Sequence, residues 1–159
     1  AAGDYFLSRR KKLQDAGRAE LYFMLGLGSY LVGYLIYGIA FLVVGTAGAP
    51  AAYAGLAIFA VIGALQYLTM NKEKLRGMEL PLLAYLVQAT LLMYGAAAFA
   101  AAQNASAASL MLFAGSFSIY LSDSFIGHHL FRHELKNSEL YITPTYIAGH
   151  LLIILGLLG

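Results

Sequence analysis

The 159-residue sequence contains no cysteine and no tryptophan, and only 11% of its residues are charged. Without cysteine the chain has no disulfide, no thiolate zinc site and no thiol nucleophile. Soluble domains carry roughly 25% charged residues. The low charge, together with 60% hydrophobic residues, therefore excludes an ordinary soluble globular protein. The net charge of +2 is too small to indicate a nucleic-acid partner.

Long uncharged runs dominate the rest of the sequence. A helix needs roughly 20 apolar residues to cross about 30 Å of hydrocarbon. The sequence therefore predicts an all-α fold, a polytopic transmembrane helix bundle that forms one domain over residues 1–159. Five spans are predicted, at residues 21–44, 50–70, 80–102, 107–127 and 141–158. Residues 1–7 are too short to cross, so we expect them to be the end of a preceding helix whose upstream helices are missing from this chain.

The basic residues are confined to alternate connections between these spans. Residues 8–20, 71–79 and 128–140 hold all 10 lysines and arginines, and the turns at 45–49 and 103–106 hold none. Cytoplasmic loops are enriched in basic residues. We therefore expect an integral membrane protein, of a bacterial inner membrane, with the three basic loops in the cytoplasm.

Two aspartates stand out against this pattern. Asp123 is the one acidic residue inside a predicted span, four residues before Gly127, and Asp4 lies four residues before the basic loop 8–20. At about 1.5 Å rise per residue, both carboxylates are expected roughly 6 Å inside the cytoplasmic interface. Gln66 falls near the same end of its span. Ionisable side chains inside a membrane are candidates for function.

Several segments carry a resemblance to a known family. Gly3-Asp4, YFMLGLGSYLVGYLIYGIAF (Tyr22–Phe41), YLSDSFIG (Tyr120–Gly127) and TYIAGHLLIILG (Thr145–Gly156) together resemble the YhhN family of membrane lysoplasmalogenases. The resemblance covers essentially the whole chain. It implies a bundle of about eight helices, of which this chain would be the later part, and hydrolysis of the vinyl ether bond of lysoplasmalogens to a fatty aldehyde and a glycerophospho-base.

The resemblance also implies that Asp4 and Asp123 are the paired catalytic acids, and it requires no cofactor. A vinyl ether is cleaved by protonating the alkene carbon farther from the ether oxygen, after which water attacks the oxocarbenium-like cation. One carboxylic acid and one carboxylate supply both needs, as they do in glycoside hydrolysis. Either aspartate could take either role.

We expect the substrate to be bound by polar and aromatic residues in or near the predicted spans. These candidates are Tyr34, Tyr37, Gln66, Ser122, Thr145, Tyr146 and His150. The expected partners are the lysophospholipid and membrane lipids. Arg9, Arg10 and Lys11 could hold the phosphate or serve as ordinary topology signals. The main alternative is a small proton- or cation-coupled transporter with the same aspartates as its relay, and the sequence leaves the oligomeric state open.

Three further features concern a possible metal site, the membrane interface and helix packing. His128, His129 and His133 could bind zinc near Asp123, because His129 and His133 would share a helix face, or they could form a solvated interfacial segment. Most tyrosines near the charged loops are expected to anchor the chain at the interface; they are Tyr22, Tyr67, Tyr85 and Tyr141. The small residues Ser29 and Gly33 predict close helix packing.

Overall fold

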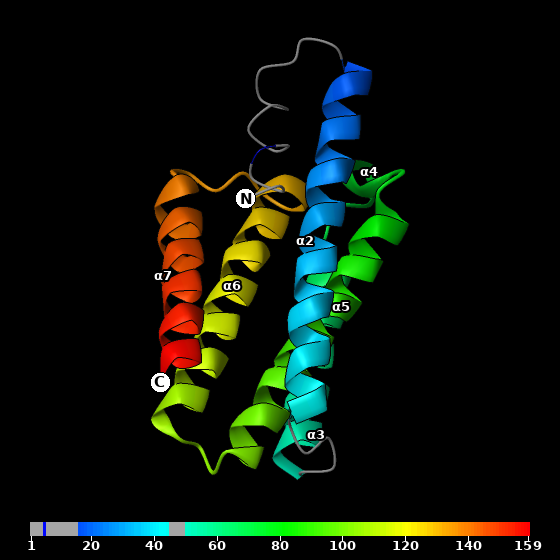
Figure 1. Ribbon diagram of the computed structural model, residues 1–159. Coiled ribbons are helices and arrows are strands. Elements are labelled where there is room, and N and C mark those ends of the chain that lie inside the picture. The colour runs from blue at the N-terminus through cyan, green and yellow to red at the C-terminus, as the bar shows by residue number, and fades with distance from the viewer. Residues whose placement is uncertain (1–4, 6–15, 45–49) are drawn as a thin grey trace.

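The computed structural model describes residue 5 and residues 16–44 and 50–159. Asp4 and the basic residues Arg9, Arg10 and Lys11 lie outside the described residues. The described chain is helical and contains no strand (Figure 1). Its helices are α2 (Ala16–Val44), α3 (Pro50–Leu68), α4 (Lys72–Leu75), α5 (Glu79–Ala102), α6 (Ala107–Phe131) and α7 (Glu139–Leu158).

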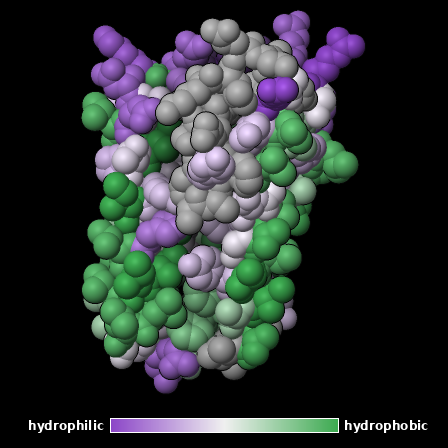
Figure 2. Space-filling model, turned by 45° about the horizontal axis from the view of Figure 1, so that its top comes forward, coloured by the Kyte–Doolittle hydropathy of each residue, from purple (hydrophilic) through white to green (hydrophobic). Residues whose placement is uncertain are grey.

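The five long helices confirm the predicted all-α transmembrane bundle. Four of them, α2, α5, α6 and α7, are long and apolar enough to cross a membrane, whereas the apolar stretch of α3, Ala52–Leu68, is shorter. A helix suits the bilayer because it satisfies its own backbone hydrogen bonds. Successive long helices run in opposite directions, so α4 and the connection from α6 to α7 lie at the same end of the bundle (Figure 1). Hydrophilic residues gather at this end, and hydrophobic residues cover the flanks below it (Figure 2).

Helix α6 is longer than predicted. It continues past Gly127, the predicted end of the span, to Phe131. At about 1.5 Å per residue, Asp123 therefore lies roughly 12 Å along the axis from the end of its helix, and not roughly 6 Å. In α7, Pro144 lies inside a helix that begins at Glu139 and continues through it.

Glycines allow α6 and α7 to pack backbone against backbone. A Cβ atom added at Gly149 would lie 2.6 Å from Cγ1 of Ile119 and 2.9 Å from the carbonyl oxygen of Gly115. A Cβ at Gly156 would lie 2.7 Å from the carbonyl oxygen of Ala108. Small residues are the usual means of close helix contact in membranes. Among the described residues, a Cβ at Gly33 of α2 would meet nothing within 4 Å, so the close packing predicted there is not found in this part of the chain.

Two buried clusters fill the bundle. The larger one is rich in aromatic and aliphatic side chains and includes Tyr34, Phe41, Phe59, Tyr85, Leu92, Met93, Ile119, Tyr120 and Ile153. The smaller one lies at the charged end and comprises Met70, Leu75, Leu82, Leu86 and Phe131. The backbone N–H of Asn71 donates to the carbonyl oxygen of Phe131 over 2.8 Å and so joins the start of α4 to the end of α6. The candidate site lies where the two clusters meet.

Candidate functional site at Asp123

Asp123 projects from α6 toward α5 and α2. Its carboxyl group interacts with the phenol hydroxyls of Tyr85, on α5, and Tyr34, on α2. The two tyrosine rings also contact each other, with centroids 6.3 Å apart. Three helices therefore contribute to one polar cluster inside a largely apolar bundle.

The hydroxyls around Asp123 have unused hydrogen-bonding capacity. Tyr34 and Tyr85 are buried, and neither hydroxyl makes a hydrogen bond of standard length and angle with another described residue. The buried hydroxyl of Tyr120, one turn before Asp123 on α6, also has no such partner among the described residues. Buried polar groups in proteins are nearly always hydrogen-bonded. These hydroxyls are therefore available to a molecule that reaches the carboxylate.

Asp123 borders an apolar cavity on one side. The cavity has a volume of about 70 Å³. Asp123, Tyr30 and Tyr85 are its polar members, and the other lining residues are Phe23, Leu27, Met78, Leu82, Ile126, Gly127, Leu130 and Phe131. These residues come from α2, α5, α6 and the segment before α5. A hydrocarbon group could thus approach the carboxyl without meeting a second charge among the lining residues.

A second, smaller cavity of about 20 Å³ touches Asp123 from the side of α3. Gln66, Tyr85, Tyr120 and Ser124 line it together with Asp123. The side-chain amide of Gln66 donates to the hydroxyl oxygen of Ser124 over 2.9 Å, and that hydroxyl donates to the carbonyl oxygen of Tyr120 over 2.7 Å. The predicted residue Gln66 is thus brought close to Asp123.

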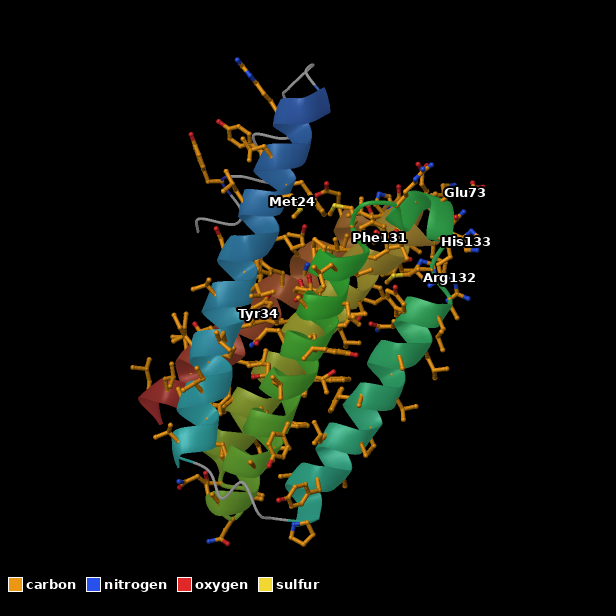
Figure 3. The ribbon with its side chains drawn as sticks, turned by 90° about the vertical axis from the view of Figure 1, so that its right-hand side faces the viewer. Met24, Tyr34, Glu73, Phe131, Arg132 and His133 are labelled. Carbon is orange, nitrogen blue, oxygen red and sulfur yellow. The ribbon has the colours of Figure 1, made fainter. Side chains whose placement is uncertain are left out.

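Gln66 and Ser124 also line a third cavity, which is polar and has a volume of about 350 Å³. Thr69, His128 and Arg132 add further polar side chains to its lining. Arg132 and His133 lie at the end of the bundle where α4 carries Glu73 (Figure 3). The small cavity shares lining residues with the apolar cavity and with the polar cavity. Asp123 therefore lies between an apolar space and a polar space at the charged end.

Three predicted substrate-binding residues have other contacts. Tyr37 stacks on Phe41, with centroids 6.5 Å apart. Ser122 is fully buried, and its hydroxyl donates to the carbonyl oxygen of Ile142 over 3.0 Å, which joins α6 to α7. Thr145 donates to the carbonyl oxygens of its own helix. The structure gives these side chains packing and bonding roles outside the cavities around Asp123.

Tyr146 and His150 of α7 join the site through aromatic contacts. The Tyr146 ring meets Tyr30 edge-on, with centroids 6.4 Å apart, and lies 4.3 Å from the His150 ring. Tyr30 in turn lies 6.0 Å from Tyr34. The nitrogen Nδ1 of His150 is 3.0 Å from the carbonyl oxygen of Tyr146. A row of aromatic rings therefore runs from His150 of α7 to Tyr34, which lies beside Asp123.

The histidines at the end of α6 do not share the predicted helix face. Because α6 ends at Phe131, His133 lies beyond the helix that carries His129. Nδ1 of His129 accepts a hydrogen bond from the backbone N–H of Leu135 over 3.0 Å. The described part of the chain contains no group of three or more potential metal ligands.

Sequence reasoning missed Tyr85, Tyr120 and Ser124 as members of the site. Tyr85 was expected to be an interfacial anchor, but it is buried beside Asp123, so that prediction is wrong. A helical repeat offered a signal for Tyr120 and Ser124, which lie within one turn of Asp123. No such local signal marks Tyr85, because it reaches the site from another helix.

The fold and the site define a polytopic α-helical membrane protein with a carboxyl group inside the bundle. The family model for the YhhN family matches residues 1–157, and the chain belongs to that family. Membership supports a lysoplasmalogenase-like protein, in a family associated with hydrolase activity. No significant match was found among curated proteins or among solved structures.

Proposed function

We propose that this protein is a membrane-embedded hydrolase that cleaves the vinyl ether bond of lysoplasmalogen. The observation that carries the proposal is the position of Asp123, which lies beside two phenol hydroxyls and between the apolar cavity and the small cavity that adjoins the polar one. A vinyl ether is itself an apolar group next to a polar headgroup. A site with these two sides fits the substrate, and family membership supports the reaction class.

Asp123 would supply one of the two carboxyl functions that the reaction needs. A protonated carboxylic acid delivers a proton to the alkene carbon farther from the ether oxygen, and a carboxylate stabilises the resulting cation and accepts a proton from water. Tyr34 and Tyr85 would hold the Asp123 carboxyl in place and donate to it when it is ionised. We propose Asp4 as the second carboxyl group, from the family pattern.

Substrate orientation follows from the positions of charge. Helix α4 and the connection after α6, which both contain basic residues, lie at the same end of the bundle (Figure 1). We propose that this end is cytoplasmic and faces the phosphate of the lipid, because basic residues favour that side and attract anionic headgroups. The alkenyl chain would then point toward the apolar cavity beside Asp123.

The alternative, a proton- or cation-coupled transporter, would need polar groups that connect Asp123 to both ends of the bundle. The polar cavity lies on the charged side of Asp123. On the other side, the larger buried cluster contributes Phe41, Leu92 and Leu112. This one-sided arrangement favours a hydrolase.

The test is aldehyde release from a defined lysoplasmalogen by the purified intact protein in detergent. The wild type should release fatty aldehyde, and Asp123→Asn should lower kcat by at least about a hundredfold, the lower range for a general acid or base. Gln88→Leu is the control, because it replaces a buried polar side chain that lines none of the cavities described above.

Asp123→Asn must remain monodisperse with the helix content of the wild type. Absence of aldehyde from the wild type would contradict the proposed reaction. Full activity in a folded Asp123→Asn variant would contradict the role of Asp123 and leave the family assignment intact. Proton-driven uptake by vesicles that contain the protein, abolished by Asp123→Asn, would support the transporter.

A further inference from the structure

We propose that the 20 Å³ cavity between α3, α5 and α6 is the binding site of the water that takes part in hydrolysis. Gln66 positions this water. Gln66 also separates the water from the polar cavity, through which water enters. This inference rests on the proposed function and deepens it. It gives the two sides of Asp123 different tasks: the apolar cavity receives the alkenyl group, and the small cavity receives water.

The size and the lining of the small cavity suit one water molecule. A cavity needs at least about 10–15 Å³, and two to four polar partners, to hold a water. Tyr85 and Tyr120 line this cavity, and their buried hydroxyls have no hydrogen-bond partner of standard geometry among the described residues. Asp123 and Gln66 also line the cavity, and their side chains carry oxygen atoms that can accept hydrogen bonds. One water can therefore satisfy two buried hydroxyls and lie against the carboxylate.

The small cavity is continuous in its lining with both neighbours. It shares Gln66, Met70 and Ser124 with the polar cavity at the charged end. It shares Leu82, Tyr85, Asp123 and Gly127 with the apolar cavity. Gln66 stands at the boundary with the polar side, because its amide is fixed by the hydrogen bond to Ser124. Water thus has a route that does not cross the space for the lipid.

The chemical step balances with water as the one co-reactant. A carboxylic acid gives its proton to the alkene carbon farther from the ether oxygen, and the alkene electron pair forms the new C–H bond. The oxygen of the bound water then forms a bond to the cationic carbon and loses a proton to a carboxylate. In the collapse of the hemiacetal, its hydroxyl loses a proton as the carbonyl forms, the bond between this carbon and the glycerol oxygen breaks, and that oxygen takes up a proton. The products are the aldehyde and the glycerophospho-base.

The kinetic test compares three site variants and one control variant of the intact protein with the wild type. Gln66→Leu and Tyr120→Phe each remove one hydrogen bond to the water. We expect each substitution to lower kcat by about tenfold. KM should change less than about twofold, because neither residue lines the apolar cavity that receives the alkenyl group. Gln66→Asn, which keeps an amide, should recover part of the lost kcat. Gln88→Leu is the matched control and should leave kcat unchanged.

A second measurement tests for the water without using activity. X-ray radiolytic labelling modifies side chains beside bound water, so Tyr85 and Tyr120 should be labelled in the protein without substrate. Gln66→Leu should lower the labelling of both. Phe41 and Phe99 contact each other in the apolar core, with centroids 5.7 Å apart, and serve as unlabelled controls.

The two failures are distinguishable. If the wild type releases no aldehyde, the proposed function fails, and the labelling pattern still decides whether water occupies the cavity. If the wild type is active and Gln66→Leu has unchanged kcat and unchanged labelling at Tyr120, the water site is refuted. An equal loss of kcat in Gln66→Leu and Gln88→Leu would also refute it, since the effect would then be general destabilisation.

Discussion

Gly149→Ala should destabilise the bundle by separating α6 from α7. The added Cβ would approach Ile119 Cγ1 to 2.6 Å and the Gly115 carbonyl oxygen to 2.9 Å. Real Cβ atoms essentially never show contacts under 3.0 Å, and the nearby backbone groups cannot rotate away as a flexible side chain can. Overpacking of this kind costs about 1–3 kcal/mol.

The size of the effect on melting follows from the length of the chain. For proteins of this size, each kcal/mol shifts Tm by about 2–4 °C, so Gly149→Ala should lower Tm by about 2–12 °C. The assay is thermal unfolding of the purified protein in one detergent, followed by the loss of monodisperse protein or by circular dichroism at the helix bands.

Gly33→Ala is the matched control. It makes the same substitution inside a helix, and its Cβ would meet nothing within 4 Å. Alanine favours helix over glycine by about 0.5–1 kcal/mol. The Tm of Gly33→Ala should therefore be unchanged or slightly higher. Equal melting temperatures for the two variants would refute the close approach of α6 and α7.

Three further predictions concern the site and its surroundings. Tyr85→Phe should lower kcat for aldehyde release by about tenfold, because the hydroxyl lies beside Asp123. It should change Tm little, because this hydroxyl has no hydrogen bond of standard geometry to lose among the described residues. A drop in Tm with unchanged kcat would contradict the proposed role of Tyr85. Ser122→Ala should lower the free energy of unfolding by about 0.5–1.5 kcal/mol and leave KM unchanged, because the Ser122 hydroxyl donates to the carbonyl oxygen of Ile142 in α7. A raised KM would indicate that Ser122 does bind the substrate. Incubation with a chelator followed by gel filtration should leave aldehyde release unchanged, because the proposed reaction uses carboxyl groups; restoration of a lost activity by zinc would overturn that chemistry.

The spans were predictable because their signal is a run of uncharged residues. Charged loops and turns of small residues mark where each helix ends. The boundaries of α5 and α7 agree with the predicted spans to within two residues. The end of α6 was not predictable in this way. His128 and His129 are polar, but a helix that leaves the hydrocarbon can continue through polar residues, and the described helix does so to Phe131.

The site was predictable only in part, for a related reason. Asp123 stands out because a carboxyl group inside a span is rare and costly. Its partners on other helices do not stand out, because a membrane helix is apolar on all sides and its sequence carries little information about which face is buried. Tyr85 therefore has the same local signature as an interfacial tyrosine, although the structure buries it beside Asp123.

The glycine contact between α6 and α7 has a consequence for the order of folding. The two helices are consecutive, and a connection of only a few residues joins Phe131 to Glu139. Pairing them closes a short loop, which costs little chain entropy, whereas Tyr34 of α2 and Asp123 of α6 are 89 positions apart in the numbering. The α6–α7 hairpin can thus assemble as a local unit soon after it enters the membrane. Asp123 is carried on this hairpin, and its tyrosine neighbours are carried on α2 and α5. The polar cluster is therefore completed only when the hairpin docks, so that formation of the site and completion of the bundle are one event.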